Sequence, residues 1–108
     1  MSAEGERTLV STRRWVNARR NDDYAAAWER VRVAVEARGA HAWRFVSRSR
    51  SGLQLEFIEF ATGADPRRSR DTRDALAALD RAHPHLASGG GAAEEWTEVR
   101  PPPDDGQS

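Results

Sequence analysis

The chain has 108 residues, of which 17 are basic and 17 acidic, so its formal net charge at pH 7 is zero. A neutral chain has no global field that draws it to nucleic acid or to an anionic membrane. Cysteine is absent, which excludes disulfides, thiolate metal sites and a cysteine nucleophile. No stretch is long and apolar enough for a membrane helix or a signal sequence. We therefore expect one soluble cytoplasmic domain without a metal or other cofactor.

The first forty residues predict a strand followed by a helix. Residues 7–16 alternate with the period of a strand. One face would carry Leu9, Ser11, Arg13 and Trp15, and the other Val10, Thr12 and Val16. Residues 21–23 then offer N-cap groups and negative charge for a helix that runs to about Arg38 and stops at Gly39. The apolar stripe of this helix consists of Tyr24, Trp28, Val31 and Val35, and it predicts that Trp28 belongs to the core.

Residues 41–60 read as a β-hairpin with apolar side chains on both faces of its strands. A two-residue turn at Ser51 and Gly52 would set the register. It would place Trp43 opposite Phe60, Phe45 opposite Ile58 and Arg44 opposite Glu59. A hairpin that is apolar on both sides needs two covers. We expect the chain's own helices to supply one cover and a second subunit the other, but the sequence does not decide which face receives which.

A second helix and a last strand complete the chain. The helix is expected to begin between Pro66 and Asp71 and to end near His83. Its stripe consists of Ala75, Leu76, Ala78, Leu79 and Ala82. A glycine-rich link at residues 88–91 leads to a short strand, 94–99, in which Trp96 would be the buried residue. We expect a flexible leader at residues 1–6 and a disordered tail at residues 100–108 around a single domain at residues 7–99.

The order strand, helix, hairpin, helix, strand is that of a ferredoxin-like α+β domain, a four-stranded antiparallel sheet with two helices on one face. With the segments AHAWRF (40–45), LEFIEF (55–60) and EEWTEV (94–99), the pattern over residues 7–99 resembles the dimeric α+β-barrel superfamily, which includes the antibiotic-biosynthesis-monooxygenase-like group. The resemblance implies a homodimer whose two sheets face each other and enclose a pocket. In that superfamily such pockets serve cofactor-free oxygenation of aromatic substrates, haem breakdown or small-ligand binding. No residue-by-residue match to a catalytic set accompanies it, so no activity is carried over.

The candidate site residues come from the sheet face that would line this pocket. His41 is the candidate catalytic group, because an imidazole at the cavity rim could accept a proton. The alternative is a histidine that merely bonds to solvent or to a neighbouring carbonyl. The candidate ligand-binding residues are Trp15, Trp43, Phe45, Ile58 and Phe60. We expect no metal site, because His83 and His85, which flank Pro84, lack the spacing and companion ligands of zinc and suit the end of a helix.

Three functions remain open from the sequence. The first is a cofactor-independent monooxygenase-like enzyme, or a binder of a small apolar or aromatic ligand. The second is a non-catalytic dimerisation or regulatory module in which the aromatic residues only seal the interface. The third and weakest is an RNA-binding protein of the RRM type, which shares the element order. Leu53, Gln54, Leu55 and Glu56 stand where that motif requires a basic residue, a glycine, an aromatic residue and no negative charge.

Overall fold

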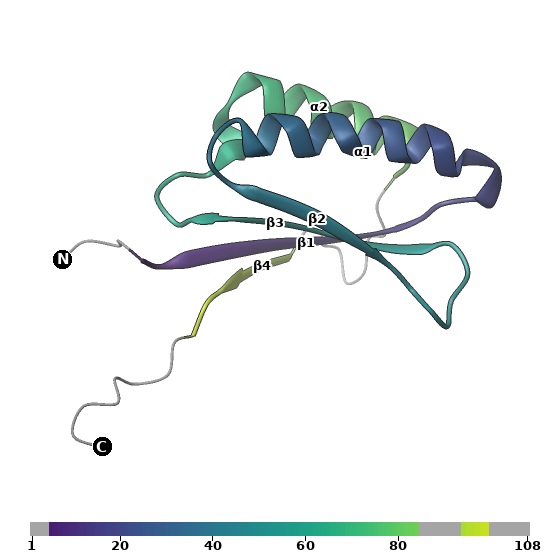
Figure 1. Ribbon diagram of the computed structural model, residues 1–108, viewed down its shortest axis with the longest axis horizontal. Coiled ribbons are helices and arrows are strands. Elements are labelled where there is room, and N and C mark those ends of the chain that lie inside the picture. The colour runs from purple at the N-terminus through teal and green to yellow at the C-terminus, as the bar shows by residue number, and fades with distance from the viewer. Residues whose placement is uncertain (1–4, 85–93, 100–108) are drawn as a thin grey trace, which may run out of the picture.

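A computed structural model describes residues 5–84 and 94–99, and within them it shows a ferredoxin-like α+β domain (Figure 1). The strands are β1 (Arg7–Trp15), β2 (His41–Val46), β3 (Leu53–Ala61) and β4 (Glu94–Thr97), and the helices are α1 (Asn21–Glu36) and α2 (Arg70–Ala82). The sheet is antiparallel in the order β2-β3-β1-β4. Figure 1 shows both helices side by side on one face of the sheet. The predicted fold class is confirmed.

Several predicted segments lie outside the described residues. These are most of the leader (1–4), the glycine-rich link within 85–93, with His85, and the tail (100–108). Among the described elements, the bounds agree with the predicted ones to within a few residues. The first helix ends two residues before Arg38, and Gly39 follows it at φ +79°.

Short 3-10 turns start both helices. Asn17 caps the turn Ala18–Arg20 by accepting a hydrogen bond from the backbone N–H of Arg19. Asp65 does the same for Pro66–Arg68, and Ser69 then caps α2 through the N–H of Thr72. Side-chain oxygens of this kind satisfy backbone donors that have no partner inside the helix. The capping chemistry therefore fixes where each helix starts.

The core lies between the helices and one face of the sheet. All four members of the predicted α1 stripe are buried, and Leu79 of α2 is buried beside them. The sheet contributes Val10, Ala42, Ile58 and Phe60. The prediction that Trp28 belongs to the core is thus confirmed. On the same side of the sheet Arg67 Nη2 donates to Glu95 Oε2 at 2.9 Å, a contact that ties β4 to the turn before α2.

The predicted hairpin register is wrong by three residues. Trp43 lies opposite Phe57 and Arg44 opposite Glu56, because six residues, 47–52, connect the strands instead of a two-residue turn. A shift by an odd number exchanges the two faces of a strand. Ile58 and Phe60 consequently lie in the helix-covered core, on the opposite face from Trp43.

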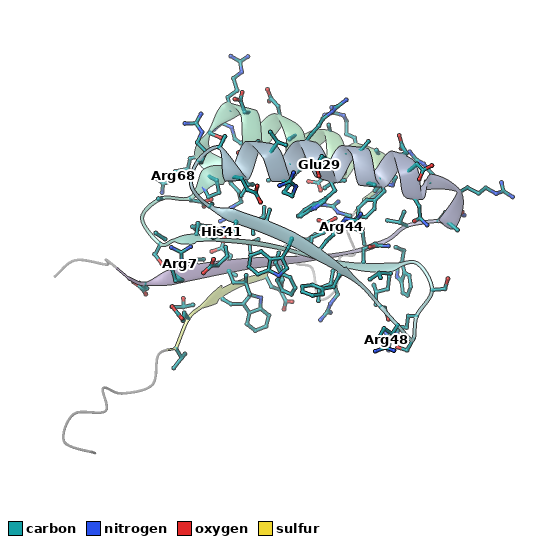
Figure 2. All side chains as sticks on the ribbon, viewed as in Figure 1. Arg7, Glu29, His41, Arg44, Arg48 and Arg68 are labelled. Carbon is teal, nitrogen blue, oxygen red and sulfur yellow. The ribbon has the colours of Figure 1, made fainter. Side chains whose placement is uncertain are left out.

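The expected Arg44–Glu59 pair does not form for the same reason. The Arg44 side chain lies on the helix side of the sheet (Figure 2), with its guanidinium carbon 5.1 Å from the centre of the Tyr24 ring, whereas Glu59 pairs with Arg7. A serine turn holds the longer connection in place, since Ser47 Oγ accepts from the backbone N–H of Arg50 at 2.9 Å. Serine side chains stabilise such turns by substituting for a backbone acceptor.

Gly52 is a position in this connection that only glycine fits without strain. Its φ is +87°, and a Cβ built there would come within 2.9 Å of the Val16 carbonyl oxygen. The Val16 N–H also donates to the Gly52 carbonyl at 2.7 Å, so the turn and the end of β1 are locked together.

We expect Gly52→Ala to lower the free energy of unfolding by about 1–2 kcal/mol, from the left-handed backbone and the close approach together. Urea unfolding followed by circular dichroism measures this. Gly63→Ala is the matched control, because Gly63 has no positive φ and a Cβ added there would meet nothing within 4 Å. Equal effects of the two substitutions would contradict the argument.

Candidate functional site

The candidate site is the sheet face that points away from the helices, which we call the open face. The strand registers place these side chains on it: Arg7, Leu9, Ser11, Arg13 and Trp15 of β1, His41, Trp43 and Phe45 of β2, Leu53, Leu55, Phe57 and Glu59 of β3, and Glu94 and Trp96 of β4. No element of the described chain covers this face (Figure 1). It is therefore the surface on which a partner or ligand would bind.

Several large aromatic side chains on the open face are exposed to solvent. The exposed fraction runs from 38% for Trp43 to 53% for Phe45, with Trp15 and Trp96 in between. Trp43 and Phe45 both contact the Phe57 ring, with centroids 5.9 and 5.6 Å apart. Exposed apolar surface gathered in one place is typical of an interaction site.

Trp96 differs from its predicted state. The last strand was expected to bury it, but β4 is an edge strand and the side chain points to the open face beside Leu9. Its indole Nε1–H donates to Ser11 Oγ at 2.8 Å, which fixes the orientation of the ring. Tryptophan commonly keeps such a polar anchor while its ring contacts an apolar partner.

A hollow of about 460 Å³ lies between Trp43 on β2 and Trp96 on β4. Leu9 contributes to the apolar part of its lining. The full lining consists of Arg7, Thr8, Leu9, Trp43, Glu59, Trp96, Thr97 and Glu98. An apolar lining with a few convergent polar groups is the usual composition of a small-ligand site.

The polar end of the hollow is an ion pair. Arg7 donates from Nε to Glu59 Oε2 at 2.8 Å and from Nη2 to Oε1 at 3.1 Å, a bidentate contact. The hydrogen bonds from Arg7 hold the pKa of the Glu59 carboxyl below its usual range, and the nearby charge of His41 acts in the same direction. Figure 2 shows Arg7 and His41 at the same end of the sheet. Glu59 is thus ionised at neutral pH.

His41 starts β2, opposite Glu59, and its side chain is exposed. This places His41 on the same face as Trp43 and Phe45, as expected, but His41 is not part of the lining of the hollow. The imidazole makes no hydrogen bond within residues 5–84 and 94–99. It is therefore free to meet a ligand or a partner subunit.

The other predicted ligand-binding residues lie either at the far end of the open face or in the core. Phe45 belongs to a second, smaller hollow of about 230 Å³ with Arg13 and Leu55, and Trp15 lies next to Leu53 at that same end of the sheet. Ile58 and Phe60 are core residues, as described above. The structure thus brings Trp43 together with Trp96, a partner that the sequence had assigned to the core.

A buried charge cluster under the helices was missed by the sequence reasoning. Arg14 is 1% exposed and donates from Nε to Glu56 Oε2 at 2.7 Å, while Glu56 is 3% exposed. Arg14 Nη1 also donates to Asp80 Oδ1 at 2.8 Å and to the His83 carbonyl at 2.7 Å. Tyr24 completes the cluster through its hydroxyl, which donates to Glu56 Oε2 at 2.6 Å. The alternation along β1 could have indicated that Arg14 is buried, because it puts Arg14 on the same face as Val10 and Val16.

The cluster joins all the layers of the domain. Burial lowers the pKa of Arg14, but the hydrogen bonds to Glu56 and Asp80 outweigh burial and raise it overall, so the guanidinium stays charged. Burial, followed by the Glu56 charge, raises the pKa of the Tyr24 hydroxyl well above its usual value, which keeps it a donor. His83 ends α2 as expected, but its ring is buried, edge-on to Tyr24 at 5.4 Å. We assign the cluster a structural role.

Two further observations concern metal ions and membranes. In residues 5–84 and 94–99, no three histidine, cysteine or acidic side chains gather as metal ligands would. Neither helix in that part of the chain has the length and apolar character needed to cross a membrane.

Comparison with known proteins supports the fold and not an activity. No family model and no curated protein matches the sequence. Among solved structures, Rv0793 from Mycobacterium tuberculosis is similar, with a TM-score of 0.60 over 89% of this chain and 95% of that chain at 11% identity. At this identity the likeness shows a shared small α+β fold alone.

Removal of the buried Glu56 charge should be far more damaging than removal of the partly exposed Glu59 charge. We expect Glu56→Gln to cost about 3–5 kcal/mol, because Arg14 is left buried without its main counter-charge. Glu59→Gln, the same change on the same strand, should cost about 0.5–1 kcal/mol, because the Arg7 and Glu59 side chains are 29% and 27% exposed. Chemical denaturation of both variants measures the difference, and similar losses would contradict the structural role of the cluster.

The Arg7–Glu59 pair also predicts a pH dependence. The pKa of Glu59 is lowered in the folded state, so its contribution to stability is present above the ordinary glutamate value of 4.5 and disappears as pH falls through the folded pKa. The difference in unfolding free energy between the wild type and Glu59→Gln should therefore be present at neutral pH and shrink as the pH falls below about 5.5. In an Arg7→Met background the difference should lose most of its pH dependence. If it keeps the full dependence there, Arg7 is not the cause.

Proposed function

We propose that this protein is a homodimer whose two open faces pack on each other and enclose a site for a small, flat, apolar or aromatic ligand. The observation that carries the proposal is the row of half-exposed aromatic side chains on a sheet face that no described element covers, with a hollow between Trp43 and Trp96. The fold shared with Rv0793 is compatible with it. The resemblance to the dimeric α+β-barrel superfamily is the reason for preferring a second copy as the cover.

The dimensions and energetics of the open face fit a dimer interface. The four strands have 9, 6, 9 and 4 residues, and at about 3.3 Å per residue and 4.8 Å between strands they present a surface on the order of 450 Å². Two such faces total about 900 Å², the size of the smaller interfaces that bury less than about 1,200 Å². Four rings of about 200 Å² that are roughly half exposed would remove on the order of 400 Å² of apolar surface, worth about 10 kcal/mol against an association cost of about 4–15 kcal/mol. Closure of the open faces is thus energetically reasonable.

In the catalytic version of this proposal, His41 accepts a proton at the rim of the enclosed site. It is exposed on the open face, and it lies opposite Glu59, whose ionised carboxylate would stabilise the imidazolium that forms. Arg7 in turn orients Glu59. This version agrees with a cofactor-independent, monooxygenase-like enzyme.

A non-catalytic dimerisation module is the second candidate. The observation that favours it is the packing of Trp43 and Phe45 against Phe57, which already forms a small aromatic cluster suited to sealing an interface. In that case the two copies would fill the hollow with side chains. A crystal structure of the dimer separates the candidates, because the ligand site requires an unfilled cavity next to Trp43.

The dimer is tested by two matched substitutions on opposite sides of the domain. Phe45 and Val33 are 53% and 55% exposed, but Phe45 lies on the open face and Val33 on the outer side of α1. At about 50 μM we expect the wild type and Val33→Arg to sediment as dimers and Phe45→Arg as a monomer, because only the latter buries a charge in the interface. Circular dichroism confirms that each variant is folded. A monomeric wild type, or a dimer that tolerates Phe45→Arg, would refute this interface.

A further inference from the structure

We propose that two ion pairs between the subunits, from Arg13 of each copy to Glu94 of the other, fix how the two open faces meet in the dimer. This inference rests on the proposed function, because it concerns the same interface. It adds the residues that set the arrangement of the copies, which the exposed aromatic side chains alone do not determine.

Two charged side chains of the open face have no partner in the described chain. Four arginine or acidic side chains lie on the strands of this face: Arg7, Arg13, Glu59 and Glu94. Arg7 and Glu59 bind each other through two hydrogen bonds. Arg13 and Glu94 are exposed and form no hydrogen bond or ion pair within residues 5–84 and 94–99. The face thus presents one unpaired positive group and one unpaired negative group.

Closure of the open face changes the environment of these two groups. In a single copy both are solvated, because both are exposed. Between two packed sheets an unpaired charge is costly, and an oppositely charged partner is needed to offset the loss of water. The closed interface therefore requires a partner for Arg13 and another for Glu94, and the two groups have opposite signs.

Two-fold symmetry makes this pair of residues self-complementary. In a symmetric dimer, a contact from residue i of one copy to residue j of the other is repeated from j to i. Glu94 on β4 lies opposite Ser11, so Arg13 is its diagonal neighbour on β1, at about 7–8 Å. A two-fold axis that passes between the two residues brings Arg13 of each copy to Glu94 of the other. Both charges are then compensated by a single arrangement of the copies.

The ion pairs would form next to the ligand site. Glu94 is two residues from Trp96 on the same face of β4, and Trp96 lines the hollow. Arg13 lines the smaller hollow with Phe45 and Leu55. Charge pairing beside these apolar surfaces gives specificity to an interface that aromatic contacts alone would leave free to slide. It would hold the second copy over the hollow between Trp43 and Trp96.

Charge reversal tests the proposal by sedimentation velocity of the full chain. Arg13→Glu and Glu94→Arg each replace two attractive contacts with two repulsive ones, so we expect each to raise the dimer dissociation constant about 100-fold or more. Arg30→Glu makes the same change at an exposed position of α1, and it should leave the constant within about threefold. Circular dichroism confirms that each variant is folded. A dimer that tolerates Arg13→Glu would overturn the proposal.

An equimolar mixture of the two reversed variants separates contacts between copies from contacts within one copy. In a heterodimer of Arg13→Glu with Glu94→Arg, each contact between the copies again joins a glutamate to an arginine, whereas the two charges within each copy are alike. At about 50 μM we therefore expect the mixture to sediment mainly as a dimer, although each variant alone is mainly monomeric. A mixture that stays monomeric would overturn the pairing between subunits.

A second mixture controls for net charge. Arg30→Glu with Glu94→Arg has the same net charges as the first mixture, but only Arg30→Glu keeps both ion pairs with itself. About half of the protein should therefore be dimeric. A control mixture that becomes fully dimeric would show that net charge, and not the Arg13–Glu94 contact, drives association.

The outcomes also separate this inference from the proposed function. If the wild type is a monomer, the proposed dimer and this inference fail together. If the wild type is a dimer that Phe45→Arg disrupts and Arg13→Glu does not, the open face is the interface and only the ion pairs are wrong.

Discussion

The ion pair between Arg14 and Glu56 determines which side of the sheet the helices cover, and the rest of the structure follows from that choice. Both groups lie on the same face of adjacent strands, where exposure to water is almost nil. A buried ion pair is stable only if its remaining N–H groups and carboxylate oxygens also have hydrogen-bond partners. Tyr24 from α1 and Asp80 and the His83 carbonyl from α2 supply the partners. The helices on this face thus supply the partners that the pair requires, and the aromatic face on the other side is left uncovered.

Much of this architecture can be predicted from the sequence, because it depends on patterns of neighbouring residues. The period-two pattern of β1 and the α1 stripe from Tyr24 to Val35 are local signals, and the structure confirms both. The hairpin register was not accessible in the same way. It depends on the contact between Gly52 and Val16, which joins residues far apart in the chain, and on a serine turn that displaced the expected two-residue turn. A single odd shift was enough to move Ile58 and Phe60 from the presumed site to the core.

The candidate site was predicted only in part. Alternation along β2 correctly placed His41, Trp43 and Phe45 on one face. Trp96 was expected to be the buried residue of the last strand, but β4 is an edge strand whose open face has no cover within the described chain. The Arg7–Glu59 pair is likewise a tertiary contact that follows from strand order, not from spacing in the sequence. The polar end of the hollow and its second wall thus appear only once the four strands are assembled.

The position of β4 has a consequence for how a ligand would enter. With four residues it is shorter than the other three strands, it lies at the edge of the sheet, and yet it carries one whole wall of the hollow. It is held by pairing with β1, by the Trp96–Ser11 hydrogen bond and by the Arg67–Glu95 contact. Elements with so few bonds open locally at much lower cost than the whole domain unfolds. In the proposed dimer, local opening of β4 would therefore admit a ligand to the hollow without dissociation of the two subunits.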